Sequence, residues 1–197
     1  MDSKRCDPSR GAAMPLAVKI LVAGGFGVGK TSMVGAVSEI RPLRTEEQLT
    51  DRSVGVDDVS GVERKTTTTV AMDFGRITIR DGLVLYLFGT PGQDRFWFMW
   101  DELARGCVGA VVLVDLRRVD DCFPAVDYFE NRRVPFVVAV NGFPETERFP
   151  IATVRDALAL SGDTPVVRMD ARASSTGLKT LVTLVEHALE RATAGVR

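Results

Sequence analysis

The sequence is poor in the residues that mark disulfide-rich, metal-binding, membrane-spanning or nucleic-acid-binding proteins. Its three cysteines, Cys6, Cys107 and Cys122, are widely spaced, which fits reduced thiols and not a disulfide framework or a cysteine metal site. The formal net charge of −1 gives no sign of non-specific binding to nucleic acid or to an anionic membrane. The longest apolar runs, such as residues 107–114, have the length of a strand and are too short to span a bilayer.

Neither end of the sequence shows a targeting signal. The first residues contain charges and Pro8 but no apolar secretory core, and the last four residues form no lipidation box. We therefore expect a cytoplasmic protein without a membrane span, which would reach a membrane only through a partner. A chain of 197 residues suits one domain, and we expect a flexible tail over 1–15 followed by a single domain over 16–197.

The strongest signal in the chain is a phosphate-binding loop. Residues 24–31 read Gly-Gly-Phe-Gly-Val-Gly-Lys-Thr, a complete G-x-x-x-x-G-K-[ST] motif. A strand-like apolar run precedes the motif and a helix-like segment follows it, which argues against a glycine-rich turn that binds nothing. Such a loop surrounds a phosphate chain with backbone N–H groups at the positive end of a helix. The motif predicts binding of a nucleoside triphosphate or its diphosphate, with Lys30 at the β- and γ-phosphates and Thr31 on Mg²⁺.

The predicted contacts within this loop are Gly25, Phe26, Gly27, Val28, Gly29, Lys30, Thr31 and Ser32.

Strand-like and helix-like segments alternate along almost the whole chain, which predicts an α/β fold with helices on both faces of a mostly parallel sheet. The expected strands are 18–23, 69–80, 83–88, 109–115, 136–141 and 166–169, and the expected helices are 30–39, 97–105, 120–131, 151–160 and 175–193. The dipeptide Asp81-Gly82 predicts a hairpin, so the six-stranded sheet should have one antiparallel edge strand. The fold class is a single P-loop NTPase domain.

The last expected helix carries an apolar stripe. Its members recur at helical spacing, so we expect this face to dock on the core; they are Leu178, Leu181, Val182, Val185 and Leu189. The lone histidine, His187, is expected on the flank of the stripe as a surface residue without a functional role.

A long polar stretch, residues 41–68, separates the first expected helix from the second expected strand. A loop of this length in a compact domain is usually functional or disordered. Four consecutive threonines, residues 66–69, close it. Plain β-propensity explains a threonine run at the start of a strand, but its place after the phosphate loop favours a segment that closes over the γ-phosphate.

With these features in order, residues 17–193 resemble the Ras-like small GTPases. Residues 89–94, Gly-Thr-Pro-Gly-Gln-Asp, resemble the family's Asp-x-x-Gly-Gln motif, with Gly92 and Gln93 in place. Residues 69–74, Thr-Val-Ala-Met-Asp-Phe, resemble the strand of the first switch, which makes Thr69 the metal-contacting threonine, with Thr68 as the alternative. Residues 170–172, Asp-Ala-Arg, resemble the Ser-Ala-Lys loop, in which a backbone N–H contacts the guanine oxygen.

Within the superfamily, the sequence is similar to the GTPases of actinobacterial conservon operons, distant relatives of the gliding-motility GTPase. It shares with them the run that starts at Thr69, the Thr-Pro-Gly-Gln run and the Ala-Val-Asn ending at Asn141. This resemblance implies GTP and GDP as ligands with Mg²⁺ as the cofactor. It also implies a roadblock-fold regulatory protein and a sensor histidine kinase as partners.

The metal site departs from the family pattern at Gly89, where the acidic residue that holds Mg²⁺ through water should stand. A water, or a carboxylate from elsewhere in the chain, would have to substitute, and we expect nucleotide binding to depend weakly on Mg²⁺. Asp115 also ends an apolar strand, but its place on a neighbouring strand favours a solvated or capping role.

The base-reading loop departs further. The family's Asn-Lys-x-Asp sequence corresponds here to residues 141–144, Asn-Gly-Phe-Pro, so Asn141 remains while the lysine and the discriminating carboxylate are missing. A site without its hydrogen-bonding partner discriminates weakly between ligands. Phe143 either stacks on the base or packs on the core, and Glu145 supplies a carboxylate only if the loop bends back.

The catalytic residues expected from the resemblance are Gln93, Lys30 and Arg95. Gln93 resembles the glutamine that orients the attacking water. Phe26 stands where a small residue commonly faces the γ-phosphate, so its bulk is expected to obstruct an arginine supplied by a partner. Arg95 either neutralises charge in cis or is a solvated surface arginine. We expect slow hydrolysis of GTP.

An aromatic run, residues 96–100, follows the second switch motif. Aromatic side chains at this place either anchor a partner or pack the second helix on the sheet, and we expect a mixture of the two. The leading hypothesis is a GTP-dependent signalling switch. The alternatives are a P-loop enzyme that uses ATP and a nucleotide-locked binding module without turnover.

Overall fold

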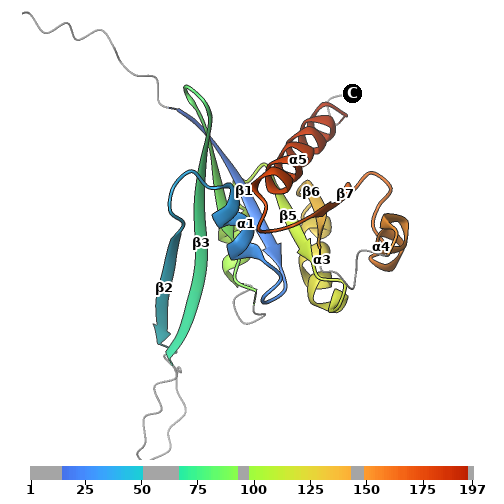
Figure 1. Cartoon of the computed structure of the whole chain (residues 1–197), viewed down its shortest axis with the longest axis horizontal. Coiled ribbons are helices and arrows are strands. Elements are labelled where there is room, and N and C mark those ends of the chain that lie inside the picture. The colour runs from blue at the N-terminus through green and yellow to red at the C-terminus, as the bar shows by residue number, and fades with distance from the viewer. Residues whose placement is uncertain (1–14, 51–66, 93–97, 143–148, 195–197) are drawn as a thin grey trace, which may run out of the picture.

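The computed structural model describes residues 15–50, 67–92, 98–142 and 149–194, with the backbone alone at 44–50 and 67–71. One seven-stranded sheet has the order β2-β3-β4-β1-β5-β6-β7 (Figure 1). Its strands are β1 (Leu16–Gly24), β2 (Leu43–Thr50), β3 (Thr67–Arg80), β4 (Leu83–Gly89), β5 (Gly109–Val114), β6 (Phe136–Asn141) and β7 (Val166–Met169). The β1–β4, β1–β5, β5–β6 and β6–β7 pairs are parallel, whereas β3 is antiparallel to both of its neighbours.

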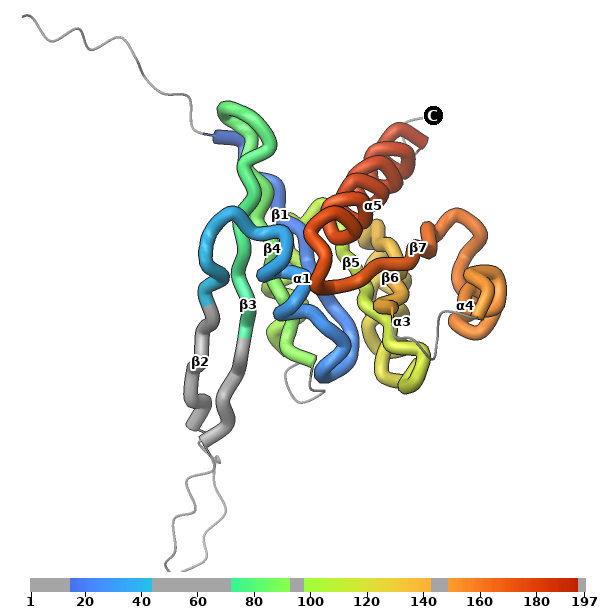
Figure 2. Tube along the Cα trace, in the orientation of Figure 1, coloured from blue at the N-terminus to red at the C-terminus, as the bar shows by residue number. Residues whose placement is uncertain are grey.

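Helices cover both faces of the sheet, as the tube trace in Figure 2 shows. They are α1 (Lys30–Val37), α2 (Trp100–Ala104), the short 3₁₀ helix η2 (Val119–Cys122), α3 (Phe123–Asn131), α4 (Ile151–Ala157) and α5 (Ser174–Ala194). Residues of α1 and α5 share one hydrophobic core with the sheet, and residues of α2, α3 and α4 share the other. The predicted α/β fold with a mostly parallel sheet is confirmed.

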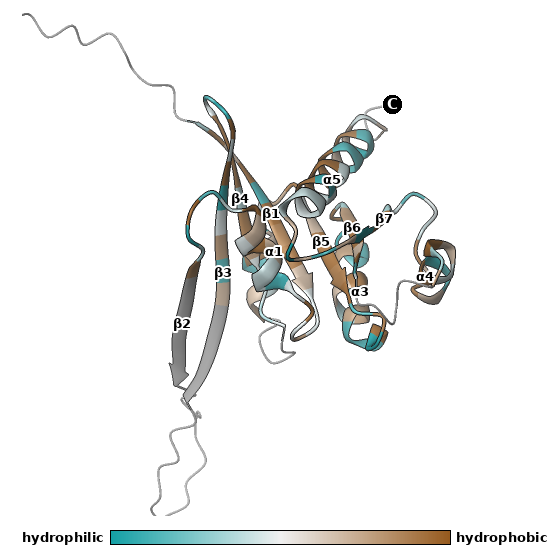
Figure 3. Cartoon of the chain, in the orientation of Figure 1, coloured by the Kyte–Doolittle hydropathy of each residue, from teal (hydrophilic) through white to brown (hydrophobic). Residues whose placement is uncertain are grey.

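The central strands are buried on both faces, which explains their continuous apolar sequences. Along β1, Ile20 and Val22 enter the core beneath α1 and α5, while Leu21 and Ala23 enter the opposite core. In Figure 3 the apolar colour is concentrated in β1, β5 and β6 at the centre of the sheet. The carboxyl ends of these strands are therefore held rigidly by the core, and the loops that follow them begin at fixed positions.

All six expected strands are present, but the polar stretch 41–68 was wrongly expected to be loop throughout. Strand β2 pairs with β3 from Leu43↔Phe74 to Thr50↔Thr67, so β3 is not an edge strand. The sequence of β2, Leu-Arg-Thr-Glu-Glu-Gln-Leu-Thr, lacks a clear alternation of apolar and polar residues. Its strand conformation is decided by hydrogen bonding to the exposed edge of β3, which a sequence pattern does not show.

Helix α5 docks on the core through only part of the expected stripe, because Leu181 is buried and Val185 packs against the core. Its buried residues are Gly177, Thr180, Leu181, Leu184, His187 and Ala188, whereas Leu178, Val182 and Leu189 are 41%, 56% and 61% exposed. A Cβ at Gly177 would lie 2.6 Å from Val37 Cγ1 of α1. This close helix–helix approach turns the glycine side of α5 inward, away from the larger apolar stripe.

His187 is also corrected, because it is only 5% exposed and not a surface residue. Burial lowers the pKa of its imidazole, so the neutral form is favoured.

Among the described residues, no helix has both the length and the apolar character that crossing a membrane requires.

Candidate nucleotide-binding site

The phosphate loop connects β1 to α1 at the carboxyl edge of the sheet. Three of its glycines, Gly24, Gly27 and Gly29, have φ values of 131°, 73° and 112°, a region that other residues rarely enter. A Cβ at Gly24 would lie 2.4 Å from the Leu113 carbonyl oxygen. The motif glycines are thus required by backbone conformation, and at Gly24 also by contact with β5.

Lys30 begins α1 and its side chain turns back over the loop. Its Nζ donates hydrogen bonds to the carbonyl oxygens of Gly24 and Gly25, at 2.8 and 2.7 Å. Burial lowers the pKa of Lys30 to about 8, and the Asp73 carboxylate acts in the opposite direction. A part-buried ammonium group whose hydrogen-bond partners among the described residues are carbonyl oxygens gains a strong charge-assisted interaction when a phosphate enters.

Thr31 contacts a carboxylate that the motif analysis did not assign to the site. Its Oγ1 donates a hydrogen bond of 2.5 Å to Asp73 Oδ2 on β3. Asp73 pairs in register with Gly89 of β4, and a Cβ at Gly89 would lie 3.3 Å from that same carboxylate oxygen. The side chain of Asp73 thus occupies the space that an aspartate at position 89 would need.

The Thr31 hydroxyl and the Asp73 carboxylate are oxygen ligands of the kind that Mg²⁺ prefers, so this pair fits the ion. We call Thr31, Asp73 and Gly89 the metal corner. The signal that could have found Asp73 is the Asp81-Gly82 hairpin, since the pairing that it starts leads to Asp73 opposite Gly89. Asp115 has a different role, because its buried carboxylate accepts hydrogen bonds from the backbone N–H and guanidinium of Arg117.

Gly92 lies directly against the phosphate loop. A Cβ at this position would lie 2.6 Å from Lys30 Nζ and 3.1 Å from the Phe26 backbone nitrogen. Residues 89–92, which resemble the start of the second switch motif, therefore reach the phosphate loop at a residue without a side chain.

Phe26, at the tip of the loop, is 67% exposed. Its carbonyl oxygen accepts a hydrogen bond of 2.8 Å from Arg118 Nη2, in the segment between β5 and η2. Arg118 also pairs with Asp121 at 3.5 Å, and a Cβ at Gly25 would lie 2.5 Å from the Asp121 Cβ. The β5–α3 connection thus supports the outer side of the phosphate loop, a contact that the sequence did not indicate.

Asn141 ends β6 and ties two loops together. Its Nδ2 donates to the Val28 carbonyl at 2.9 Å, and its Oδ1 accepts from the Ala171 backbone N–H at 3.0 Å. The Gly142 N–H donates to the Met169 carbonyl at 2.7 Å. In this arrangement the Ala171 N–H, which belongs to the loop whose backbone is expected to contact the base, is bonded to Asn141.

A hollow of about 300 Å³ lies beside the phosphate loop. Its lining residues are Gly27, Gly29, Ser32, Asn141, Gly142, Asp170, Ala171 and Arg172. All eight belong to motifs expected to bind nucleotide, although they come from three separate parts of the sequence. We call Asn141, Gly142, Asp170 and Arg172 the base corner.

Several expected site residues lie outside the described residues, namely Gln93, Arg95, Phe143 and Glu145. The backbone of Thr69 is described, in β3, four residues from Asp73, a separation of about 13 Å along a strand. This arrangement does not bring Thr69 to the Thr31–Asp73 pair. Of the aromatic run, Trp100 is buried in the core while Phe98 is 66% exposed, so core packing is confirmed for Trp100 and the expected partner contact stays a prediction.

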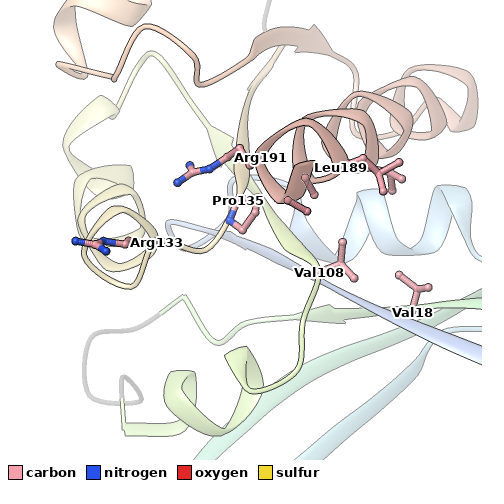
Figure 4. Close-up of a pocket in the computed structure, with 9 residues that line it drawn as sticks. Val18, Val108, Arg133, Pro135, Leu189 and Arg191 are labelled. Carbon is pink, nitrogen blue, oxygen red and sulfur yellow. The ribbon is translucent and has the colours of Figure 1, made fainter. Parts of the chain in front are cut away.

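A larger hollow, of about 600 Å³, lies at the opposite end of the strands, near their amino ends. Figure 4 shows Val18, Val108, Pro135 and Leu189 among its apolar lining residues, with Arg133 and Arg191 on the side of Pro135. Val18 lies near the start of β1, and Val108 and Pro135 directly precede β5 and β6. Ligands of open α/β sheets bind at the carboxyl ends of the strands, so the smaller hollow is the candidate nucleotide site.

Comparison with known proteins agrees with this geometry. Residues 22–191 match the family described as "Conserved hypothetical ATP binding protein". The chain belongs to this family. Uncharacterized protein MJ1339 of Methanocaldococcus jannaschii is 31% identical over 126 residues, which cover 63% of this chain and 69% of that protein.

Solved structures share the fold at low sequence identity. The G domain of the T. maritima FeoB iron transporter has a TM-score of 0.56 and 18% identity, with coverage of 90% of this chain and 99% of that one. The cytosolic domain of the same transporter, in GDP form I, has a TM-score of 0.62 and 16% identity, with coverage of 89% and 65%. Together with the phosphate loop, these findings show a P-loop NTPase fold in a nucleotide-binding family.

Proposed function

We propose that this protein is a guanine-nucleotide-dependent switch that binds GTP and GDP with Mg²⁺, hydrolyses GTP slowly and regulates partner proteins. The observation that carries the proposal is the contact between Thr31 and Asp73 beside a complete phosphate loop. It places a carboxylate beside the Thr31 hydroxyl in a chain whose Asp-x-x-Gly-Gln-like motif lacks one, and such a pair of oxygen ligands fits a phosphate-bound Mg²⁺.

Each part of the site has a role in this proposal. The loop N–H groups and Lys30 bind the phosphates, and Thr31 with Asp73 holds Mg²⁺, which neutralises phosphate charge when bound. Gln93 orients the attacking water, and Arg95 neutralises charge in cis. Thr69 contacts the metal when the first switch is ordered over the γ-phosphate, which requires a conformation of β3 other than the one described.

Two exposed aromatic side chains, Phe26 and Phe98, support slow hydrolysis and control by partner proteins. The exposed Phe26 side chain stands where a partner's arginine would have to approach, so rapid stimulated hydrolysis is disfavoured. The exposed Phe98, next to the second switch, is a surface that nucleotide state can alter. By resemblance to the conservon GTPases, we propose a roadblock-fold protein and a sensor histidine kinase as partners of one domain over 16–197, in the cytoplasm.

A P-loop enzyme that uses ATP is the second candidate. Two observations favour it: the family description names ATP, and residues 142–144 lack the lysine and aspartate that read guanine. A nucleotide-locked module without turnover is the third candidate.

The nucleotide that co-purifies with the protein, followed by single-turnover phosphate release from GTP and ATP, separates these candidates. A switch retains GDP or GTP and releases phosphate slowly from GTP alone, with acceleration by a roadblock-fold protein. Gln93→Leu should slow release without weakening binding, whereas Asn131→Leu, at the end of α3, should change neither. Turnover of ATP but not GTP would refute the proposal, and bound nucleotide without any turnover would favour the locked module.

A further inference from the structure

The base corner contains a carboxylate at a place where the motif analysis expected only a backbone N–H. Asp170 follows β7 and lines the hollow beside the phosphate loop together with Gly142 and Arg172. Its oxygens are the only side-chain carboxylate oxygens among the described residues that line this hollow.

The other polar groups of the base corner, on Asn141 and Gly142, make hydrogen bonds that hold the loops together. Both polar atoms of the Asn141 side chain are used, on the Val28 carbonyl and the Ala171 N–H. The Gly142 N–H is used on the Met169 carbonyl. Among the described residues that line the hollow, a base therefore meets Asp170 as the only carboxylate and Arg172 as the only side-chain cation.

We propose that Asp170 selects guanine over adenine by accepting hydrogen bonds from the guanine N1–H and exocyclic amine. This inference rests on the proposed nucleotide-binding function and deepens it. Guanine presents these two donors side by side, so one carboxylate can accept both. Adenine presents a lone pair at N1, which an ionised carboxylate repels, and a polar site that loses its partner rejects the wrong ligand strongly.

The local structure fixes Asp170 for this task. Its Oδ1 accepts the Arg172 backbone N–H at 2.9 Å, and its backbone N–H and C=O contact the Thr176 hydroxyl at 3.2 and 2.8 Å. These contacts close the turn at the start of α5 and limit the positions open to the carboxyl group. The neighbouring guanidinium lowers the pKa of Asp170, so the carboxylate remains ionised and acts only as an acceptor.

The side chain of Arg172 must give way when the base binds. Its Nε and Nη2 lie 2.9 and 3.0 Å from the two carboxylate oxygens. The Arg172 side chain is 80% exposed, so this ion pair contributes little to stability and is easily exchanged. Once released, the planar guanidinium can lie over the face of the base, in place of the lysine that this sequence lacks.

Binding of fluorescent GDP, IDP, XDP and ADP to the full chain with Mg²⁺ tests the proposal. The wild type should bind GDP about 100-fold more tightly than ADP and about 10-fold more tightly than IDP, which lacks the exocyclic amine. Asp170→Asn should weaken GDP binding by about 30-fold and strengthen XDP binding, because the asparagine N–H₂ can donate to the xanthine 2-oxygen. Asparagine preserves the turn acceptor, and circular dichroism verifies folding.

Asp156→Asn, an exposed carboxylate on α4, is the matched control and should leave all four affinities unchanged. Glu145→Gln tests the competing assignment, since Glu145 is the other carboxylate expected near this loop. It should leave the order of the four nucleotides unchanged, and Arg172→Ala should weaken GDP and XDP equally. A specificity change in Glu145→Gln but not in Asp170→Asn overturns the assignment. If the wild type binds GDP and ADP equally well and Lys30→Ala abolishes that binding, the role of Asp170 in base selection is also overturned. The proposed nucleotide binding is then retained. Absence of binding by the folded wild type overturns both proposals.

Discussion

The metal corner and the base corner both lack the carboxylate that Ras-like small GTPases have at the corresponding position, and for each we propose a substitute on a neighbouring segment. At the metal corner, Asp73 extends from a paired strand and contacts Thr31 directly. At the base corner, Asp170 lies in the turn after β7 and contacts Arg172 instead. Figure 1 shows how β3 and β7 approach the phosphate loop from opposite sides of β1.

The difference between the corners is one of preorganisation. Strand register fixes the position of Asp73, because moving it by one residue would turn its side chain to the other face of the sheet. The carboxylate of Asp170 must exchange an exposed arginine for a base before it can act. We therefore expect the metal corner to form before nucleotide binds and the base corner to form during binding.

Lys30→Ala should produce the largest effect and should affect both corners equally. The ammonium group makes charge-assisted contacts to phosphate, so its loss should weaken GDP and GTP by about 1000-fold. Filter retention or isothermal calorimetry measures this change. Lys179→Ala, an exposed lysine on α5, is the control. Normal retention by Lys30→Ala would remove the phosphate loop from the site.

Asp73→Asn separates the two corners. Loss of the carboxylate should weaken Mg²⁺-dependent nucleotide retention by about 10- to 100-fold while leaving the preference for GDP over ADP intact. Gly89→Asp alone should also impair retention, because the new side chain would crowd Asp73 Oδ2, which lies 3.3 Å from a Cβ at Gly89.

The swapped variant, Gly89→Asp with Asp73→Gly, should recover much of the Mg²⁺ dependence by moving the carboxylate to the adjacent strand. Dissociation of labelled GDP in the presence and absence of EDTA reports on all three variants. Unchanged dissociation in Asp73→Asn would mean that another group holds the ion.

The pH dependence of nucleotide affinity tests the charge of the Lys30 ammonium, on which nucleotide binding at both corners depends. The Lys30 ammonium has a pKa of about 8 in the free protein, and phosphate binds and stabilises its charged form. Affinity should therefore be constant below pH 8 and fall by about tenfold per pH unit above it, until the pKa of the complex is reached. Fluorescence titration between about pH 7 and 9.5 measures this. Lys30→Arg should be flat over the same range, and a flat wild-type curve would contradict the buried ammonium.

Arg118→Ala should have the smallest effect of the series. It removes one hydrogen bond to the Phe26 carbonyl from a half-exposed side chain, so nucleotide affinity should fall by about two- to fivefold. Arg105→Ala, on the exposed surface after α2, is the control. A change in base preference in Arg118→Ala would mean that this arginine reaches the base, which would weaken the division into two corners.

Much of the fold could be predicted because its signals are local. The apolar runs of β1, β5 and β6, the glycine loop and the Asp81-Gly82 hairpin each determine their own structure. Strand β2 was missed because its charged sequence becomes a strand only against β3. The docked face of α5 was misjudged because Gly177 allows an approach to Val37 that outweighs the larger apolar side chains.

In the candidate site, the phosphate loop was predicted from its motif, and Asn141 and residues 170–172 were predicted from their resemblance to loops of the small GTPases; the structure brings them around one hollow. Asp73 and Arg118 were not found. Both contact the phosphate loop across long sequence separations. Asp73 stands in the run 69–74 that resembles the first-switch strand, but that resemblance assigned the metal contact to Thr69 and gave Asp73 no role.

The sequence by itself determined that this chain binds phosphate, because a phosphate loop works through consecutive backbone N–H groups and a single lysine. Tertiary structure alone decided which carboxylates lie near the phosphate loop, Asp73 beside Thr31 and Asp170 beside the hollow. The distance from Asp73 to Thr31 depends on strand pairing, and the distance from Asp170 to the phosphate loop depends on sheet order. Neither the strand pairing nor the order of strands in the sheet can be deduced from the residues next to these aspartates.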